Sequence, residues 1–142
     1  MTRPCLVIAA LVLLLAPLPA AAGPPAPFER ELAPAPGGMV ATVIDGDTLI
    51  LADGREIRLV GIQAPKLPLG RPGFKAWPLS TEAKAFLEEL TQDASLSLGF
   101  GGRRGDRHGR VLAHLFDAQG RWIQGEILRA GLARVYSFSD GR

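Results

Sequence analysis

Cysteine is nearly absent from this chain of 142 residues. The one cysteine, Cys5, lies close to the start, and no second cysteine is present. An internal disulfide is therefore excluded, so the fold has to be stabilised by a packed core. The two histidines, His108 and His114, are too few for a transition-metal site of the usual Cys/His kind. We interpret His114 as a strand histidine rather than a ligand.

The chain also lacks an excess of charge of one sign. It has 16 Lys and Arg residues against 14 Asp and Glu residues, and only Arg3 of these lies among the first 22 residues. The net charge by itself therefore does not favour a nucleic-acid partner. One segment has no acidic side chain at all, since no Asp or Glu stands between Glu56 and Glu82.

A third absence is an apolar run long enough for a membrane span, which needs about 18 residues or more. Arg3 precedes an apolar stretch at 5–15, Pro17 and Pro19 interrupt the next few residues, and three alanines stand at 20–22. This pattern predicts a signal peptide of residues 1–22, cleaved after Ala22. The prolines disfavour the alternative, a membrane anchor. We expect an exported chain, periplasmic or secreted, with no membrane span in its mature part.

Residues 23–38 are mostly proline, alanine and glycine. Such a composition buries little apolar surface and predicts a flexible tether. The remaining length fits one folded domain over residues 39–142.

Within this domain the pattern alternates between short β-rich runs and helical spacing. Strands are predicted at 39–44, 48–51, 55–62, 95–99 and 110–116. A helix is predicted at 80–92, capped by Ser80 or Thr81, and a second one at 124–130. One helix between the third and fourth strands, and a short second helix near the C-terminus, suit a mainly β (α+β) fold. We predict a five-stranded Greek-key β-barrel of the OB-fold type.

Four motifs identify a family. They read Ile-Asp-Gly-Asp-Thr at 44–48, Ile-Arg-Leu-Val-Gly-Ile at 57–62 with Pro65, Asp-Arg-His-Gly-Arg at 106–110, and Gly-Glu-Ile-Leu-Arg-Ala-Gly-Leu-Ala at 125–133. In order and spacing they resemble the staphylococcal nuclease (thermonuclease) family. The resemblance implies a calcium-dependent phosphodiesterase that hydrolyses DNA or RNA. The chain is expected to lack that family's C-terminal helix.

The resemblance assigns roles to four residues. Asp47 matches a calcium carboxylate, and Asp45 matches a carboxylate that helps through water. Arg58 and Arg110 match two catalytic arginines, whose guanidinium groups hold the phosphate under attack. Taken alone, residues 45–47 are also typical of a simple turn, and the arginines of solvated charges.

The departures from the family lie in one short run. Where the family has Asp-Thr-Pro-Glu, this chain has Gln63, Ala64, Pro65 and Lys66. Gln63 stands at a metal carboxylate and supplies an oxygen without charge, so calcium binding is expected to be weak or absent. Lys66 stands at the general base, whose loss typically costs about 10²–10⁴ in rate. We hypothesise that the Lys66 ammonium points back to Asp47 in place of the ion. The alternative is that it points to solvent.

Basic residues cluster after the fourth predicted strand. The predicted contacts to a phosphate backbone are Arg103, Arg104 and Arg107 of this cluster, with Lys66, His108 and Tyr136. The match of Tyr136 to a substrate-stacking tyrosine of the family requires a one-residue gap. A solvated basic loop is the alternative.

Two classes of function are compatible with these residues. The first is a monomeric binding module for nucleic acid or another phosphate-rich polyanion, with little or no cleavage; a protein partner is also compatible with this class. The alternative is an active calcium-dependent nuclease. The changes at Gln63 and Lys66 favour the first, whereas Asp45, Asp47 and the two arginines keep the second open.

Overall fold

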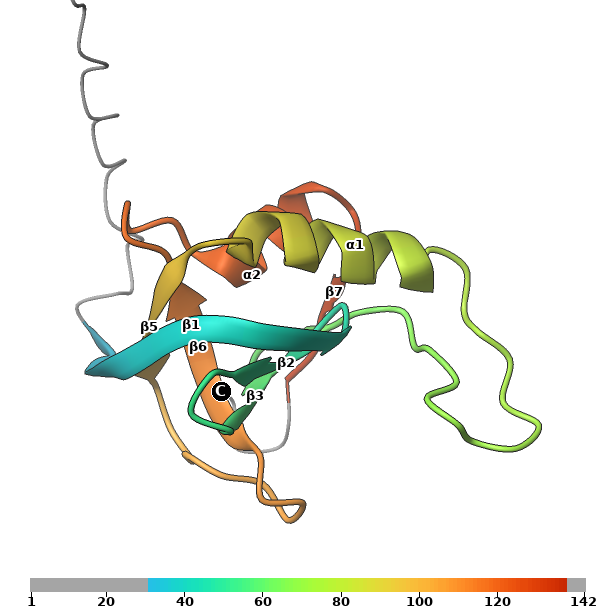
Figure 1. Cartoon of the computed structure of the whole chain (residues 1–142), viewed down its shortest axis with the longest axis horizontal. Coiled ribbons are helices and arrows are strands. Elements are labelled where there is room, and N and C mark those ends of the chain that lie inside the picture. The colour runs from blue at the N-terminus through green and yellow to red at the C-terminus, as the bar shows by residue number, and fades with distance from the viewer. Residues whose placement is uncertain (1–30, 138–142) are drawn as a thin grey trace, which may run out of the picture.

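The structure is a computed structural model that describes residues 31–137 (Figure 1). The predicted signal peptide, residues 23–30 of the predicted tether, and residues 138–142 lie outside the described part. Within residues 31–137, no helix has the length and apolar character needed to cross a membrane.

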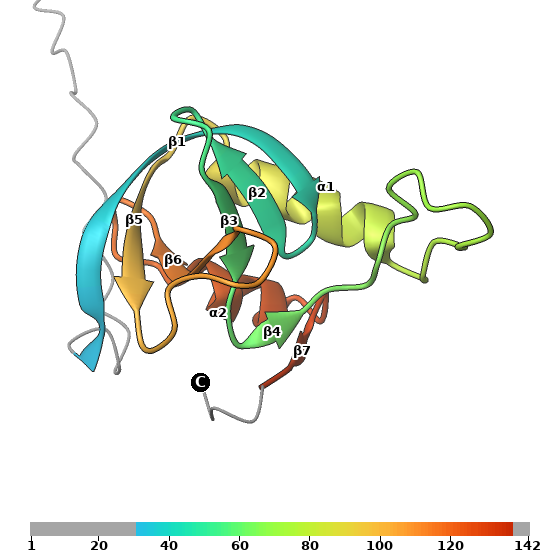
Figure 2. The ribbon, with the colours of Figure 1, turned by 90° about the horizontal axis from the view of Figure 1, so that it is seen from below.

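Five strands form a closed barrel in the order β1-β2-β3-β6-β5 (Figures 1 and 2). They are β1 (Ala33–Asp45), β2 (Thr48–Leu51), β3 (Glu56–Leu59), β5 (Ser95–Phe100) and β6 (Val111–Phe116). Neighbouring strands are antiparallel except β3 and β6, which run parallel. A small separate sheet pairs β4 (Ile62–Gln63) with β7 (Arg134–Val135). The predicted mainly β barrel with two helices is confirmed.

Alternating apolar side chains fill the barrel. Residues that point inward along a strand are two apart, so Ile57 and Leu59 of β3 are both fully buried. Leu49 of β2 and Leu115 of β6 meet them in the same core. The helices α1 (Ser80–Thr91) and α2 (Ile123–Arg129) lie together on one side of the barrel (Figure 1). Leu87 of α1 extends the core toward that side.

The predicted start of the folded region at residue 39 is wrong. The strand β1 begins at Ala33, and residues 33–38 pair with β5 instead of forming part of a tether. The glycines that suggested flexibility have a packing role, because a Cβ at Gly37 would clash with the Leu96 carbonyl oxygen. The Arg55 guanidinium also donates to the Gly37 carbonyl at 2.7 Å and so holds the strand in place.

The predicted cap of the first helix is also wrong. Leu79, with a left-handed φ of 64°, occupies the N-cap position and makes no side-chain cap hydrogen bond. Between β4 and α1 the chain forms a long loop that projects from the barrel (Figures 1 and 2). The base of this loop is closed by the Trp77 amide, which donates to the Lys66 carbonyl at 2.9 Å. Lys66 is thereby fixed beside the barrel.

Candidate functional site

The turn between β1 and β2 places two carboxylates in the interior. Asp45 and Asp47 are 4% and 0% exposed. The Asp47 amide donates to Asp45 Oδ1 at 3.1 Å, which closes the turn. A Cβ at Gly46 would lie 2.6 Å from the Ala83 Cβ and 2.7 Å from the Ala64 Cβ, so only glycine lets the turn pack against α1. The packed turn keeps both carboxylates from water.

The Lys66 ammonium lies on these carboxylates. Its Nζ is 2.8 Å from Asp47 Oδ2, 3.0 Å from Asp47 Oδ1 and 3.6 Å from Asp45 Oδ2. The predicted direction of Lys66 toward Asp47 is confirmed. The side chain is 22% exposed, and its ammonium is engaged by the two carboxylates.

The pKa values of the two carboxyl groups are shifted in opposite directions. Burial alone would raise the pKa of Asp47, but the charges of Arg58 and Lys66, with hydrogen bonds from Lys66 and the Ala64 amide, hold it below its ordinary value. Burial and the negative charge of Asp47 raise the pKa of Asp45, and the charge of Lys66 offsets this only in part. The cations therefore favour the charged form of Asp47 over that of Asp45.

Arg58 lies on β3 between the inward-pointing Ile57 and Leu59, and its largely buried guanidinium turns toward the β1–β2 turn. Its Nη1 donates to the carbonyl oxygens of Leu59 and Asp47, and its Nη2 to the Ile62 carbonyl at 2.8 Å. The same Nη2 lies 3.2 Å from Asp47 Oδ2. These contacts occupy the terminal N–H groups of the guanidinium, which presents its donors as a planar fork. Arg58 therefore braces the turn and the start of β4 rather than offering a free fork to a phosphate.

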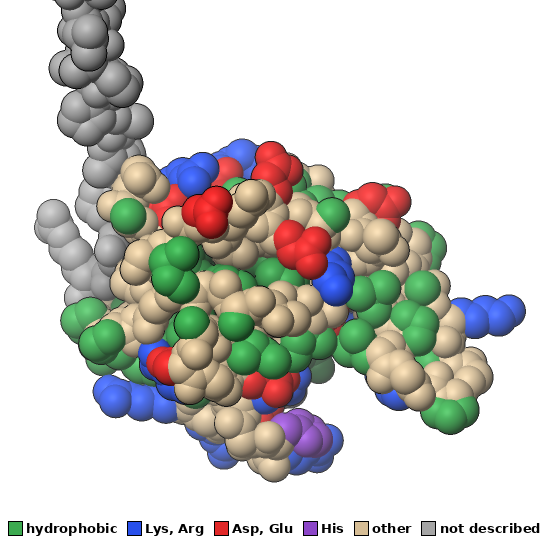
Figure 3. Space-filling model, viewed as in Figure 1, with side chains coloured by type: hydrophobic (Ala, Val, Ile, Leu, Met, Phe, Trp, Pro, Cys, Tyr) green, Lys and Arg blue, Asp and Glu red, His purple; other side chains and the backbone are tan. Residues whose placement is uncertain are grey.

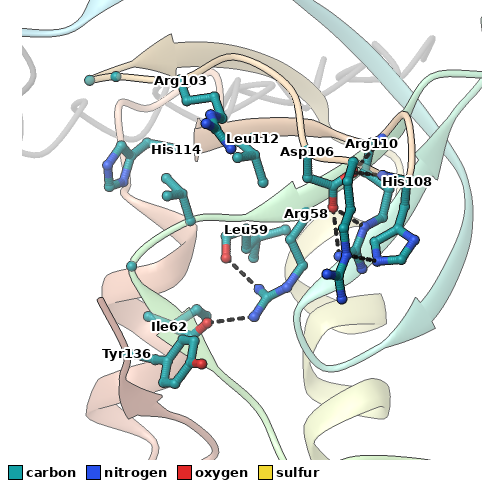
Figure 4. Close-up of a pocket in the computed structure, with 15 residues that line it drawn as sticks. Arg58, Leu59, Ile62, Arg103, Asp106, His108, Arg110, Leu112, His114 and Tyr136 are labelled. Atoms are coloured by element: carbon teal, nitrogen blue, oxygen red, sulfur yellow. Dashed lines mark hydrogen bonds and ion pairs between the residues drawn. The ribbon is translucent and has the colours of Figure 1, made fainter. Parts of the chain in front are cut away.

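A pocket with a volume of about 470 Å³ opens beside Arg58 (Figure 4). Predicted site residues that line it are Arg58, Arg103, Arg107, His108, Arg110 and Tyr136. Val60 and Leu112, both half-buried, give it an apolar surface. Arg104 does not line the pocket, because its guanidinium stacks on the Phe100 ring 4.8 Å from the centroid.

His114 of β6 also lines this pocket. The Trp122 Nε1–H donates to His114 Nδ1 at 3.2 Å, and burial lowers the pKa of His114. The predicted place of His114 in a strand is confirmed, but no sequence signal indicated that it reaches the pocket. Figure 4 shows His114 on the side opposite Arg110.

The second predicted arginine, Arg110, is paired with Asp106. Its Nε and Nη2 both lie 2.7 Å from Asp106 Oδ2, while the amides of His108 and Arg110 donate to Oδ1. These hydrogen bonds outweigh burial and lower the pKa of Asp106. Asp106 therefore holds the shape of the loop and is poorly suited to accept a proton from water.

Gln63 is turned to a partner that the sequence did not suggest. In the register of β4 with β7, Gln63 pairs with Arg134, whose Nε and Nη2 donate to Gln63 Oε1 at 3.1 and 2.6 Å. The amide oxygen predicted as a weak calcium ligand thus accepts from a guanidinium. Only the pairing of β4 with β7 reveals this partner. The Tyr136 amide, next to β7, donates to the Gly61 carbonyl and holds Tyr136 at the pocket.

The residues around Asp47 do not fit a calcium ion as they are arranged. Calcium takes about six to eight oxygen ligands. Among residues 31–137, no three His, Cys, Asp or Glu side chains form a group able to hold a metal. The oxygens of Asp47 already accept from Lys66, Ala64 and Thr48, and the Gln63 oxygen accepts from Arg134.

Comparisons with known proteins agree with the fold and the motifs. The family described as staphylococcal nuclease homologue matches residues 56–142. A protein of Escherichia coli named as an uncharacterized endonuclease is 32% identical over 102 residues, which cover 70% of this chain and 60% of that protein. The thermonuclease of Staphylococcus hyicus is 29% identical over 99 residues, covering 68% and 57% respectively. The chain thus spans less than two thirds of the length of these relatives. It belongs to the staphylococcal nuclease homologue family.

Proposed function

We propose that this chain is an exported barrel that binds single-stranded nucleic acid or another phosphate-rich polyanion and cleaves it little or not at all. The observation that carries the proposal is a pocket with basic side chains but no carboxylate free to act as a base. Arg103, Arg107 and Arg110 line it, and the one acidic residue among its lining side chains, Asp106, is held by Arg110.

Binding is supported by the exposed basic side chains of residues 101–110. Arg103, Arg107 and His108 are exposed at the pocket. Figure 3 shows basic side chains gathered around a histidine at the lower edge of the molecule, where this loop lies in Figure 1. Cations along such a rim release counterions from a phosphate backbone, which provides most of the sequence-independent affinity for nucleic acids. The apolar surface at Val60 and Leu112, both half-buried, offers a contact for a base or a sugar.

Weak hydrolysis is supported by the state of the former catalytic positions. An ammonium at Lys66 cannot take a proton from water at neutral pH. Arg58 is bound to carbonyl groups and to Asp47. It therefore stabilises the developing negative charge of a transition state less than a free guanidinium would. The lysine at position 66 and the engagement of Arg58 are therefore expected to lower the rate of hydrolysis more than the affinity for the polyanion.

The alternative is a calcium-dependent nuclease, and the names of the relatives favour it. It would retain Asp45, Asp47, Arg58 and Arg110 in their family roles. Lys66 would then have to leave Asp47 and another group would have to serve as the base.

Export is part of the proposal and has its own test. N-terminal sequencing of the chain recovered from the periplasm or medium of a bacterial host is expected to begin at Gly23. Recovery of the intact N-terminus in the cytoplasm alone would contradict export.

The binding proposal is tested by fluorescence anisotropy with a labelled single-stranded oligonucleotide in the presence of chelator. Arg107→Ala is expected to weaken binding about tenfold and to reduce the slope of log affinity against log salt by about 1. The matched control is Arg104→Ala, which removes the same charge from the same loop but outside the pocket. Equal losses in the two variants, or no binding by the native chain, would overturn the proposal.

A further inference from the structure

We infer that Lys66 is a resident cation that replaces the metal ion, so that the site works without calcium and excludes it. The inference rests on the proposed function for what the pocket binds, but it makes a separate statement about the neighbouring carboxylates. Its basis is the arrangement of Lys66, Asp45 and Asp47.

The first step is the contact geometry. Both oxygens of Asp47 accept from the Lys66 ammonium, at 2.8 and 3.0 Å. Oδ2 also accepts from the Ala64 amide at 2.7 Å, and Oδ1 from the Thr48 hydroxyl at 3.1 Å. Together with Arg58 at 3.2 Å, these donors surround the carboxylate as metal and water would. Both carboxylate oxygens of Asp47 therefore already have donors in the positions that a metal ion would take.

The second step is charge. The two carboxylates of Asp45 and Asp47 are balanced by the cations of Lys66 and Arg58: both cations contact Asp47 Oδ2, and Lys66 also lies 3.6 Å from Asp45 Oδ2. A divalent ion added to this group would leave an uncompensated double positive charge where Asp47 is fully buried. Such a charge is strongly unfavourable in a poorly solvated site. Calcium can therefore enter only if the ammonium leaves.

The third step is that the backbone fixes Lys66 at both sides. The Ala64 amide is bound to Asp47, and the Lys66 carbonyl accepts from the Trp77 amide at 2.9 Å. Pro65 between them restricts the chain further. The backbone of the lysine is thus held beside the carboxylates by a closed loop, so binding of the ammonium costs side-chain rotamer freedom but little further backbone entropy.

This arrangement has a functional consequence for the pocket. Arg58 touches Asp47 and lines the pocket, so the cation at Asp47 sets the position of the pocket wall. With Lys66 in place, the affinity for a polyanion and the melting temperature are expected to be the same in calcium and in chelator.

The test is a calcium titration by calorimetry, with thermal melting in calcium and in chelator, on the native chain and on Lys66→Gln. The native chain is expected to show no saturable calcium binding and no change in melting temperature. Lys66→Gln frees the carboxylates and adds an oxygen. It is expected to bind one calcium ion and to melt about 5 °C higher or more in saturating calcium than in chelator.

Two controls localise the effect. Lys75→Gln removes an exposed lysine from the same loop and is expected to behave as the native chain. Asp47→Asn combined with Lys66→Gln removes the carboxylate and is expected to lose the calcium response. If Lys66→Gln is unfolded in chelator, circular dichroism is expected to show that calcium refolds it.

Micromolar binding of one calcium ion by the native chain would overturn the inference. So would the absence of any calcium effect on Lys66→Gln, because the lysine would then not be the group that keeps the ion out. Neither result depends on the anisotropy assay in chelator, so this inference and the proposed function can fail separately.

Discussion

Replacing Lys66 by methionine removes an ammonium from a carboxylate that water does not reach. Removing one partner of a buried ion pair typically costs about 3–5 kcal/mol. The cost is expected to be smaller here, because Lys66 is 22% exposed and Asp47 keeps the Ala64 amide, the Thr48 hydroxyl and Arg58. We expect a loss of about 2–3 kcal/mol in the free energy of unfolding, or about 10 °C in melting temperature for a domain of this size.

The assay is urea unfolding at neutral pH in chelator, read by Trp fluorescence and circular dichroism. Lys75→Met, on the same loop, is expected to change the free energy of unfolding by less than about 0.5 kcal/mol. Asp47→Asn completes a double-mutant cycle in which Lys66 and Asp47 are expected to couple by at least about 1 kcal/mol. A Lys66→Met variant as stable as the native chain, or strictly additive losses, would refute the account of this pair.

Carboxyl NMR titration is expected to place the pKa of Asp47 below the ordinary aspartate value and that of Asp45 above it, as their surroundings require. The Asp47 contribution to stability is present above its unfolded-state pKa and is lost as pH falls through its lower folded pKa. The Asp45 contribution is present below its unfolded-state pKa and is lost as pH rises through its higher folded pKa. Asp45→Asn is therefore expected to leave unfolding free energy at neutral pH unchanged or higher, whereas a loss above about 1 kcal/mol would show that the charged carboxylate is needed. Gln124→Leu is expected to cost about 1–3 kcal/mol in chemical denaturation, because the Leu115 amide loses its side-chain acceptor, whereas the Ala113 carbonyl keeps the Val60 amide; a neutral effect would contradict this.

The barrel could be predicted because its strands carry local signals. Apolar alternation and a tight turn at residues 45–47 involve adjacent positions, and the resemblance to one family indicated their order. The first part of β1 could not be predicted in this way. Its residues 33–38 are prolines, glycines and alanines, and their pairing depends on β5, which lies far along the chain. A composition that disfavours a strand locally was overridden by a long-range partner.

The same distinction holds at the site. The direction of Lys66 could be predicted from its place in a family motif and from the two carboxylates opposite it. The partner of Gln63 could not, because Arg134 reaches it only through the pairing of β4 with β7. The contacts of the Arg58 guanidinium depend on the backbone carbonyl of Ile62, the first residue of β4. Every residue type supplies a backbone carbonyl, so hydrogen bonds to carbonyls cannot be predicted from the side chains. The sequence therefore could not show that the Arg58 guanidinium is already engaged.

The most direct test of the central claim is a cleavage assay on end-labelled single-stranded DNA. The chain beginning at Gly23 is compared with the thermonuclease of Staphylococcus hyicus, each in calcium and in chelator. The account predicts that the DNA is bound equally in both conditions, and that any cleavage is at least about 10³-fold slower than that of the relative, from the missing base and the occupied metal position. Calcium-dependent cleavage within tenfold of the relative would contradict it.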